Sequence, residues 1–197
     1  IICWLFSTIG CDIRDPEAQF LEGQKYANGD GVLEDKEEAL KWFRLAAEQG
    51  HAEAQFNLGV IYGNGRGVPQ DDKEALKWYR LAAEQGNADA QWSLGSMYST
   101  GIGVIKDLKK SVDWYRLAAE QGLPAAQYAL GWMYANGKGV EQNHILAHMR
   151  FSLAANKGNN NAKKWRISIS KEMTPEQITQ AQNLAIECEE RSYKYCD

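Results

Sequence analysis

Residues 54–86 read AQFNLGVIYGNGRGVPQDDKEALKWYRLAAEQG, and the spacing of their apolar residues decides the fold. In the first part of this stretch, the i, i+4, i+7, i+8 spacing of one helix face links Ala54, Leu58, Ile61 and Tyr62. In the second part, a matching helical pattern links Ala75, Tyr79, Ala82 and Ala83. The stretch therefore predicts two amphipathic helices joined by a glycine-rich loop.

The loop YGNGRGVPQD, residues 62–71, has the glycine content of loops that hold phosphate groups before a helix. A phosphate site normally occurs once per domain, but the paired glycines recur at Gly29/Gly31, Gly65/Gly67, Gly101/Gly103 and Gly137/Gly139. We therefore interpret the loop as the end of one helix and the start of the next. Gly65 favours a left-handed helix end, and Val68 is expected to anchor the loop in the core.

The end of the same loop predicts the start of the second helix. Asp71 is the expected N-cap, with Glu74 as the second half of a capping box. The residue between the paired glycines changes from repeat to repeat. We expect any further function of the loop at these exposed tips, which are Asp30, Arg66, Ile102 and Lys138.

The same pattern recurs along most of the chain with a period of 36 residues. Ala-Gln followed by an aromatic residue begins at Ala18, Ala54, Ala90 and Ala126. The segment LAAEQG, or LAANKG in the last case, begins at Leu45, Leu81, Leu117 and Leu153. This period predicts an all-α fold, an α/α superhelical solenoid of helix-turn-helix repeats over residues 15–158. The four repeats are expected at about 15–50, 51–86, 87–122 and 123–158.

The chain after residue 158 departs from the repeat. Ala162 keeps the phase, but basic residues occupy positions 163, 164 and 166, which predicts a degenerate capping half-repeat at residues 159–171. Thr174 as N-cap, Pro175 and Gln177 then predict a helix start. Residues 174–197 are expected to form a capping helix and a tail.

One glycine recurs inside each first helix, at Gly23, Gly59, Gly95 and Gly131. Glycine there costs about 1 kcal/mol relative to alanine. Four such glycines predict that another backbone approaches closely, with the alanine pairs of the second helix as the partner surface.

Charge and hydropathy exclude two classes of partner. The net charge is −4 and no basic stripe stands out, so we expect no nucleic-acid partner. No apolar run approaches the roughly 18 residues that span a bilayer.

The uncharged residues 1–10, IICWLFSTIG, match the apolar region of an export signal. The sequence STIGC is similar to a bacterial lipobox, in which Cys11 carries the lipid. Cleavage after Gly10 by ordinary signal peptidase is the alternative. The sequence thus predicts a bacterial protein that is periplasmic or secreted. Lipidated Cys11 attaches it to a membrane on the lipobox interpretation, and cleavage after Gly10 leaves it without that anchor.

After removal of the signal, Cys188 and Cys196 remain as a pair, and an oxidising compartment favours their disulfide. On the chain-entropy account such a short loop contributes about 2–3 kcal/mol. Metal binding by these two cysteines is the weaker alternative because no histidine lies near them in sequence.

The 36-residue period, the A-x-x-x-LG-x-x-Y pattern, the GxGV loop and W-[YF]-x-LAAEQG together resemble the Sel-1-like repeat family. The resemblance covers roughly residues 15–165. Departures are local: Glu22 replaces a leucine, Arg150 replaces the tryptophan of the other repeats, and His148 takes a core-like position. The resemblance implies a solenoid that mediates protein–protein contacts, often in exported bacterial adaptors or regulators. The family also has a cysteine-rich branch that is linked to penicillin binding and weak β-lactamase activity.

Enzymatic chemistry has little support in the residues. Ser168 and Lys171 match the S-x-x-K motif of β-lactamases, but the S-D-N and K-T-G motifs are absent. His144 and His148 are spaced as a metal pair without a third ligand, so we expect His144 at the surface and His148 at the edge of the core. We predict no catalytic residue, no metal and no cofactor.

The variable positions of the first helices predict the partner surface. One register holds Leu21, Asn57, Ser93 and Ala129, and a second holds Gln24, Val60, Ser96 and Trp132. Both lie away from the constant stripe. With Trp92 among the neighbouring aromatics and Trp132 as the strongest anchor, these residues are the expected contact surface. Packing between repeats is the alternative role for the aromatics. The sequence therefore predicts a monomeric, non-enzymatic scaffold for a protein or peptide, with a penicillin-binding or weak β-lactamase-like protein as the alternative.

Overall fold

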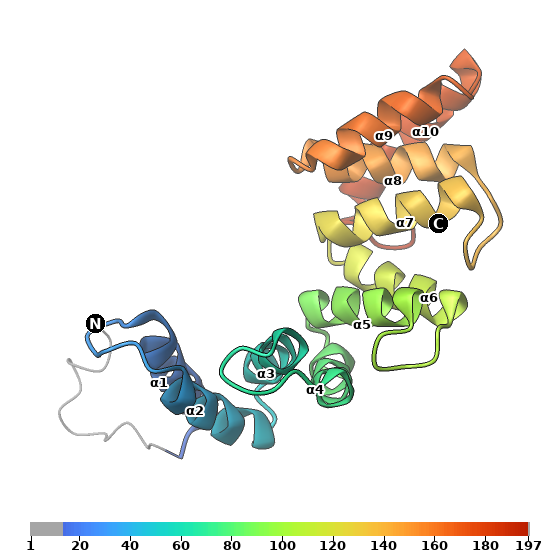
Figure 1. The fold of residues 1–197 in the computed structure, drawn as a ribbon. Helices are drawn as coiled ribbons and strands as arrows, with labels where there is room; N and C mark the ends of the chain where they lie inside the picture. Colours follow the sequence, from blue (N-terminus) through green and yellow to red (C-terminus); the bar gives the residue numbers. More distant parts are fainter. Residues whose placement is uncertain (1–13, 197) are drawn as a thin grey trace. The chain divides into compact units, whose positions relative to one another are not determined.

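The computed structural model describes residues 14–196, and this range is built from α-helices joined by loops (Figure 1). The helices are α1 (Pro16–Asn28), α2 (Lys36–Glu48), α3 (Ala52–Asn64), α4 (Asp72–Glu84), α5 (Ala88–Thr100), α6 (Leu108–Ala119), α7 (Pro124–Asn136), α8 (His144–Asn156), α9 (Asn160–Ser170) and α10 (Pro175–Glu190). The expected export signal at residues 1–10 and Cys11 lie outside this range. Among these helices, none combines the length and the hydropathy that a membrane span requires.

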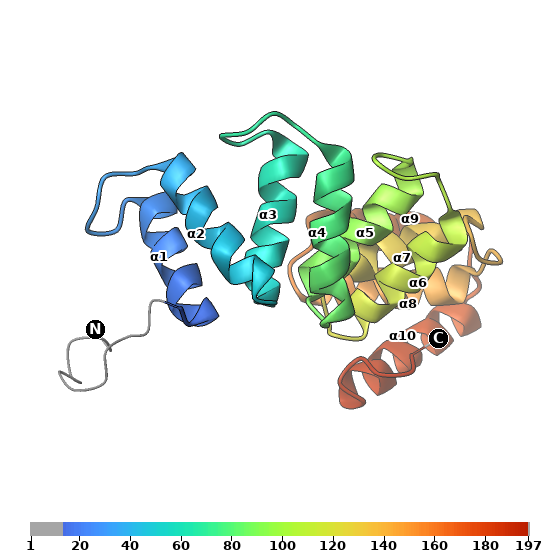
Figure 2. The same cartoon turned by 90° about the horizontal axis from the view of Figure 1, so that it is seen from below.

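The chain folds as two compact units, one ending at Asn87 and the other beginning at Ala88. In the N-terminal unit, α2 packs against both α1 and α3, and α3 packs against α4 (Figure 2). In the C-terminal unit, α5 to α8 pack consecutively in the same way, and both α9 and α10 pack on α8. The predicted all-α class of paired helices in 36-residue repeats is therefore confirmed.

The glycine loops end one helix and start the next, as predicted. Gly65 caps α3 with a φ of 64°, in the left-handed region that favours glycine. The carboxylate of Asp71 accepts hydrogen bonds from the backbone N–H groups of Lys73 and Glu74, both at 3.0 Å. The equivalent caps of α2, α6 and α8 are Asp35, Asp107 and Asn143.

The capping box expected at Asp71 is only half formed. The backbone N–H of Asp71 donates to the carbonyl of Tyr62, and the carboxylate of Glu74 pairs with Lys77 Nζ at 3.0 Å instead. A complete capping box forms at α10, where Thr174 and Gln177 exchange hydrogen bonds.

The glycines inside the first helices face a different neighbour from the expected one. A Cβ atom on Gly59 would lie only 2.5 Å from the ring atoms Cδ1 and Cε1 of Tyr79. The rings that take the same place in the other repeats are Phe43 over Gly23, Tyr115 over Gly95 and Phe151 over Gly131. The close approach is confirmed, but the nearest neighbour is a ring and not the expected backbone or alanine pair. At Gly23 the backbone carbonyl of Ala39 also lies close, 3.3 Å from the Cβ position. An aromatic ring of the second helix lies on each glycine because only a residue without a side chain leaves it room.

Buried glutamines link the helices, a role that the sequence analysis did not predict. Gln55 Nε2 donates to the carbonyl of Ala47 at 3.0 Å, and its Oε1 accepts from Gln85 Nε2 at 2.7 Å. The same pairing joins Gln19 to Gln49 and Gln91 to Gln121. In the fourth repeat the partner changes, and Arg150 Nη1 donates to Gln127 Oε1 at 2.9 Å. The glutamine of the Ala-Gln motif thus satisfies polar groups inside the core.

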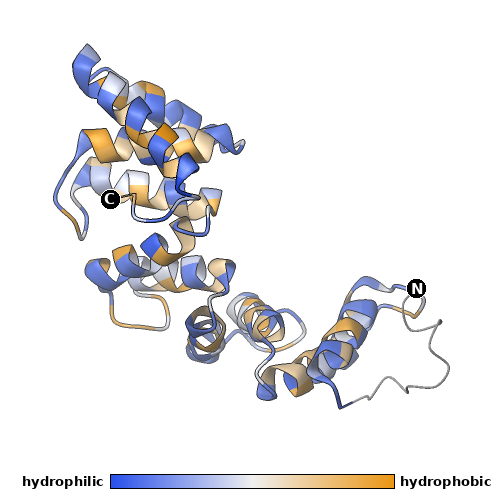
Figure 3. Ribbon diagram, turned by 180° about the vertical axis from the view of Figure 1, so that it is seen from behind, coloured by the Kyte–Doolittle hydropathy of each residue, from blue (hydrophilic) through white to orange (hydrophobic). Residues whose placement is uncertain are grey.

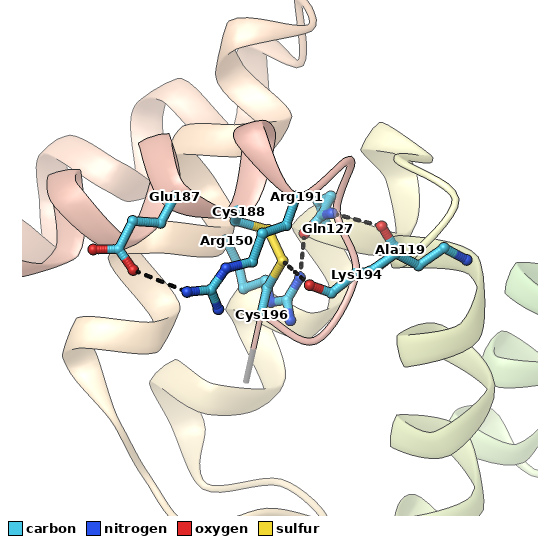
Figure 4. The surroundings of a disulfide bond; sticks show 8 residues. All are labelled: Ala119, Gln127, Arg150, Glu187, Cys188, Arg191, Lys194 and Cys196. Atoms are coloured by element: carbon cyan, nitrogen blue, oxygen red, sulfur yellow. Dashed lines mark hydrogen bonds and ion pairs between the residues drawn. A yellow bond between two sulfur atoms is a disulfide. The ribbon is translucent and has the colours of Figure 1, made fainter.

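The last helix covers one side of the fourth repeat. Met149 and Leu153 of α8 are buried against Ala181 and Ala185 of α10. The predicted disulfide is present, with the Cα atoms of Cys188 and Cys196 5.3 Å apart, and it closes the tail onto the end of α10 (Figure 4). Arg150 and Gln127 lie beside this closed tail in the same view. The departures at His148 and Arg150 therefore accompany a covering helix, while α8 itself remains regular.

Candidate functional site

A groove of about 320 Å³ in the N-terminal unit brings three predicted contact residues together. These are Gln24 of α1 and Asn57 and Val60 of α3. The rest of the lining consists of Ala27, Asn28, Lys36, Ala39, Phe43, Ile61 and Arg66. The groove is therefore built by the first helices of two successive repeats and by the second helix between them.

The repeat frame explains why these side chains meet. Gln24 and Val60 are equivalent positions one repeat apart, on the helix side away from the constant stripe. Phe43 reaches the groove because its ring lies on Gly23, where a Cβ atom would be 2.7 Å away. Arg66 sits between two left-handed glycines, Gly65 and Gly67, with φ values of 64° and 78°. The glycine loop thus presents its variable tip to the groove.

The charged side chains of the lining are both cations, Lys36 and Arg66. Lys36 Nζ lies 3.4 Å from Glu34 Oε1, but both side chains are exposed and such surface pairs contribute little. Gln24 and Asn57 add amide groups, and Phe43, Val60 and Ile61 supply an apolar wall. Lys36 was not among the predicted contact residues, because the variable positions used for that prediction lie on the first helices alone. The signal was available, since the equivalent positions hold Asp72, Leu108 and His144.

The other predicted contact residues lie outside this groove. Leu21 is exposed on α1, and Trp92 is 36% exposed on α5. Ser93 Oγ donates to the carbonyl of Asp89, and Ser96 hydrogen-bonds the buried Tyr115, whose pKa is raised by that burial. Ala129 and Trp132 pack against the core of the C-terminal unit.

Phe56 and Tyr128 pack within their own repeats, whereas the alternative role expected for the aromatics was packing between repeats. Phe56 contacts the ring of Tyr79 with centroids 5.9 Å apart, and Tyr128 contacts Phe151 at the same distance. The hydrophobic colour of the loop between α5 and α6 in Figure 3 marks a different surface. Ile102, the predicted variable tip of that loop, is 51% exposed there, and Ile105 is more exposed still.

Ser168 with Lys171 and His144 with His148 are the candidates that the sequence offers for catalysis and metal binding. Ser168 and Lys171 are exposed at the end of α9. His144 lies 3.9 Å from Glu172 near the surface, whereas His148 is buried. Among residues 14–196, no group of three or more His, Cys, Asp or Glu side chains is placed to hold a metal ion.

The helices pair within each repeat, glycines end the first helices in the left-handed conformation, and an aromatic ring of each second helix packs on a glycine of the first. Together these features define a helical repeat protein. Residues 16–51, 52–87, 88–123 and 124–159 each match the Sel1 repeat. These matches cover most of the chain, so the protein belongs to the Sel1 repeat family. No curated protein matches the chain at a significant level.

Solved structures agree with this assignment. A Sel1 repeat protein from Oxalobacter formigenes is 41% identical, with a TM-score of 0.73 over 78% of this chain and 63% of that one. A protective antigen of uropathogenic Escherichia coli with the same repeat fold is 36% identical, with a TM-score of 0.81 over 90% of this chain and 39% of that one. Cysteine-rich protein B of Helicobacter pylori, at 24% identity, a TM-score of 0.50 and coverage of 64% and 95%, shows the shared fold alone. This chain spans less than two thirds of the length of the first two relatives.

Proposed function

We propose that this protein is a non-enzymatic interaction scaffold that holds a protein or peptide segment in the groove between α1 and α3. The observation that carries the proposal is the meeting of Gln24, Asn57 and Val60 in one groove. These positions vary among the repeats, whereas the frame around them is constant. Repeat proteins commonly bind partners along such surfaces.

The lining specifies the chemistry of the partner segment. Phe43, Val60 and Ile61 favour an apolar side chain, and Lys36 and Arg66 favour a carboxylate beside it. The chain as a whole carries a net charge of −4, so this cationic lining is a local feature. The preferred partner is therefore a segment that pairs an acidic residue with an apolar one.

The remaining predicted residues are proposed as further contacts on each unit. Leu21 extends the surface of α1 beyond the groove. In the C-terminal unit the proposed contacts are Trp92, Ser93, Ser96, Ala129 and Trp132. Trp132 is the proposed anchor among them because tryptophan dominates many interfaces.

Selection of a phage-displayed random peptide library on the full chain tests the proposal. We expect enriched peptides to pair an acidic with an apolar residue, and we expect Arg66→Glu to weaken their binding about tenfold or more. Lys138→Glu is the matched control, because Lys138 is the equivalent loop tip of the fourth repeat. Enrichment of peptides without acidic residues, or equal binding by the Arg66→Glu variant, would contradict the proposal.

A second pair of variants tests whether the register of Val60 and Ser96 contributes to peptide binding. Val60→Glu introduces a charge into the apolar wall and is expected to weaken peptide binding. Ser96→Glu makes the same change at the equivalent position of the third repeat. A loss in both variants would extend the contact surface to the C-terminal unit, and a loss in neither would exclude this register.

We further propose that the protein acts outside the cytoplasm of a bacterium, as a monomer whose C-terminal end is capped by α9, α10 and the tail. The Cys188–Cys196 disulfide supports export, because disulfides persist in oxidising compartments. Lipid attachment at Cys11 is tested by labelling with a fatty acid, which Cys11→Ser should abolish.

Hydrolysis of nitrocefin that is lost in Ser168→Ala would overturn the non-enzymatic assignment.

A further inference from the structure

A second cavity, of about 490 Å³, lies among α8, α9 and α10 in the C-terminal unit. Its lining includes His148 and Ser152 of α8 and Arg166 and Ser170 of α9. Ile178 and Ile186 of α10 form an apolar wall. The volume falls within the range of small-molecule sites, which combine apolar walls with a few convergent polar groups.

The buried imidazole is the observation that indicates a ligand. His148 is only 3% exposed, and its Nδ1 atom is buried without a hydrogen-bond partner among the described residues. Nearly all buried polar atoms in native proteins are paired with protein, water or ligand, so a polar ring at this position needs an explanation. The imidazole is part of the cavity lining, where a ligand can contact it. Packing alone does not explain it, since Leu76 fills the equivalent position in the second repeat without a polar atom.

The hydroxyl groups of the lining already donate their hydrogens to backbone carbonyl groups. Ser152 Oγ donates to the carbonyl of His148 at 2.9 Å, and Ser170 Oγ donates to the carbonyl of Arg166 at 2.7 Å. Donors that remain for a ligand are the imidazole of His148, the guanidinium of Arg166 and the side-chain amide of Gln182. Of these, only the guanidinium carries a permanent positive charge. Within residues 14–196, Arg166 makes no side-chain ion pair.

The charges around the cavity differ between its two sides. Burial of the imidazole lowers the pKa of His148, and the charge of Arg166, which is half-buried on α9, lowers it further. On α10, Glu189 is exposed and accepts a hydrogen bond from Asn156 Nδ2 at 3.2 Å. The side next to the imidazole is therefore cationic, while the negative charge is at the solvent-exposed rim.

We propose that this cavity binds a ligand that carries a carboxylate next to an apolar group. Arg166 and the imidazole of His148 bind the carboxylate, and Ile178 and Ile186 contact the apolar group. This chemistry has two sources, a free carboxylic acid or the C-terminal residue of a peptide chain. The site is distinct from the groove between α1 and α3, so either can fail without the other.

Calorimetric titration of the full chain with two matched pairs of probes tests the proposal. 4-Methylpentanoate represents a free acid and N-acetylleucine represents a peptide C-terminus, and their amides, 4-methylpentanamide and N-acetylleucinamide, lack the negative charge. We expect the carboxylates to bind about tenfold more tightly than their amides or better, because charge-assisted hydrogen bonds are lost in the amides. The tighter of the two carboxylates identifies the source.

Two further measurements locate the binding. Arg166→Gln, at a half-exposed position that should not impair folding, is expected to weaken carboxylate binding about tenfold, whereas Lys164→Gln on the same helix should have no effect. In the imidazole NMR spectrum, which contains only His51, His144 and His148, the ligand should shift His148 alone. The proposal is overturned if neither carboxylate binds, if the amides bind equally well, or if Arg166→Gln leaves the affinity unchanged.

Discussion

The second and fourth repeats share one frame but differ in what surrounds their second helices. In α4, Lys77 and Leu81 are exposed and the helix shows a polar side to solvent. In α8, the equivalent Met149 and Leu153 are fully buried beneath α10. Both helices nevertheless place an aromatic ring on the glycine of the preceding helix.

This comparison separates two kinds of information in the repeat. The glycine, the aromatic ring and the alanines fix how the two helices of a repeat pack. The positions between them decide whether the second helix faces water or another helix. At one such position the second repeat has the exposed Lys77, and the fourth has Met149, which is buried against α10.

The largest expected effect comes from a charge at the covered position. Leu153→Lys should destabilise the C-terminal unit by about 3–5 kcal/mol, because it buries a lysine without a partner beneath α10. Leu81→Lys, the same change at the exposed equivalent, should stay within about 0.5 kcal/mol. Urea unfolding followed by circular dichroism measures both. Similar losses of unfolding free energy in the two variants would contradict the burial of Leu153 beneath α10.

The disulfide joins the covering helix α10 to the tail, and its loss is expected to give the next largest effect. Reduction should cost about 2–3 kcal/mol of stability and increase amide exchange in residues 191–196. Exchange in α3 and α4 should not change. The doubly substituted Cys188→Ala, Cys196→Ala protein is the control, because a reductant should not alter it further. Unchanged exchange at the tail after reduction would show that packing alone holds it.

The shared frame is tested at the glycines of α3. Gly59→Ala should destabilise by about 1–3 kcal/mol, because its Cβ would lie 2.5 Å from the Tyr79 ring. Gly63→Ala in the same helix meets only ordinary contacts and should be neutral or stabilising by up to about 1 kcal/mol. Thermal unfolding measures whether each variant is less or more stable than the parent protein. A Tyr79→Leu background should reduce the cost at Gly59, and an undiminished cost there would exclude the ring as its cause.

The smallest effect concerns the pH dependence of the covered repeat. Burial and Arg166 lower the pKa of His148 below its ordinary value, so the unfolded chain binds a proton more readily than the folded one. Stability should therefore fall as the pH drops below about 6.5, by at most about 1.4 kcal/mol per pH unit. His148→Phe should lessen this fall, and His144→Phe should not. An equal pH dependence in the parent and His148→Phe proteins would contradict it.

The sequence predicts the frame well because each of its parts recurs with the same spacing. The caps at Gly65 and Asp71 and the helix start at Thr174 follow from local backbone chemistry, and the structure contains all three. The ring on Gly59 was missed, because a glycine in a helix indicates a close neighbour without identifying it. The pairing of Gln55 with Gln85 was also missed, since hydrogen bonds between residues so far apart have no local pattern.

The candidate groove was predictable in part. Variation among the repeats pointed to Gln24, Asn57 and Val60, which lie together in the structure. Lys36 and Phe43 come from the second helix and needed the packing of α2 between α1 and α3 to be seen. The cavity beside His148 was not predictable, because α10 lies outside the repeat and nothing in the period indicates where it packs.

The most direct test of the proposed scaffold is hydrogen–deuterium exchange of the full chain with and without a selected acidic–apolar peptide. We predict slower exchange in the two segments that border the groove. These are residues 24–36, from α1 to the start of α2, and residues 57–66, from α3 into its following loop. The Arg66→Glu protein should lose this protection at the same peptide concentration. Protection confined to other segments, or protection that survives Arg66→Glu undiminished, would contradict the assignment of this groove as the partner site.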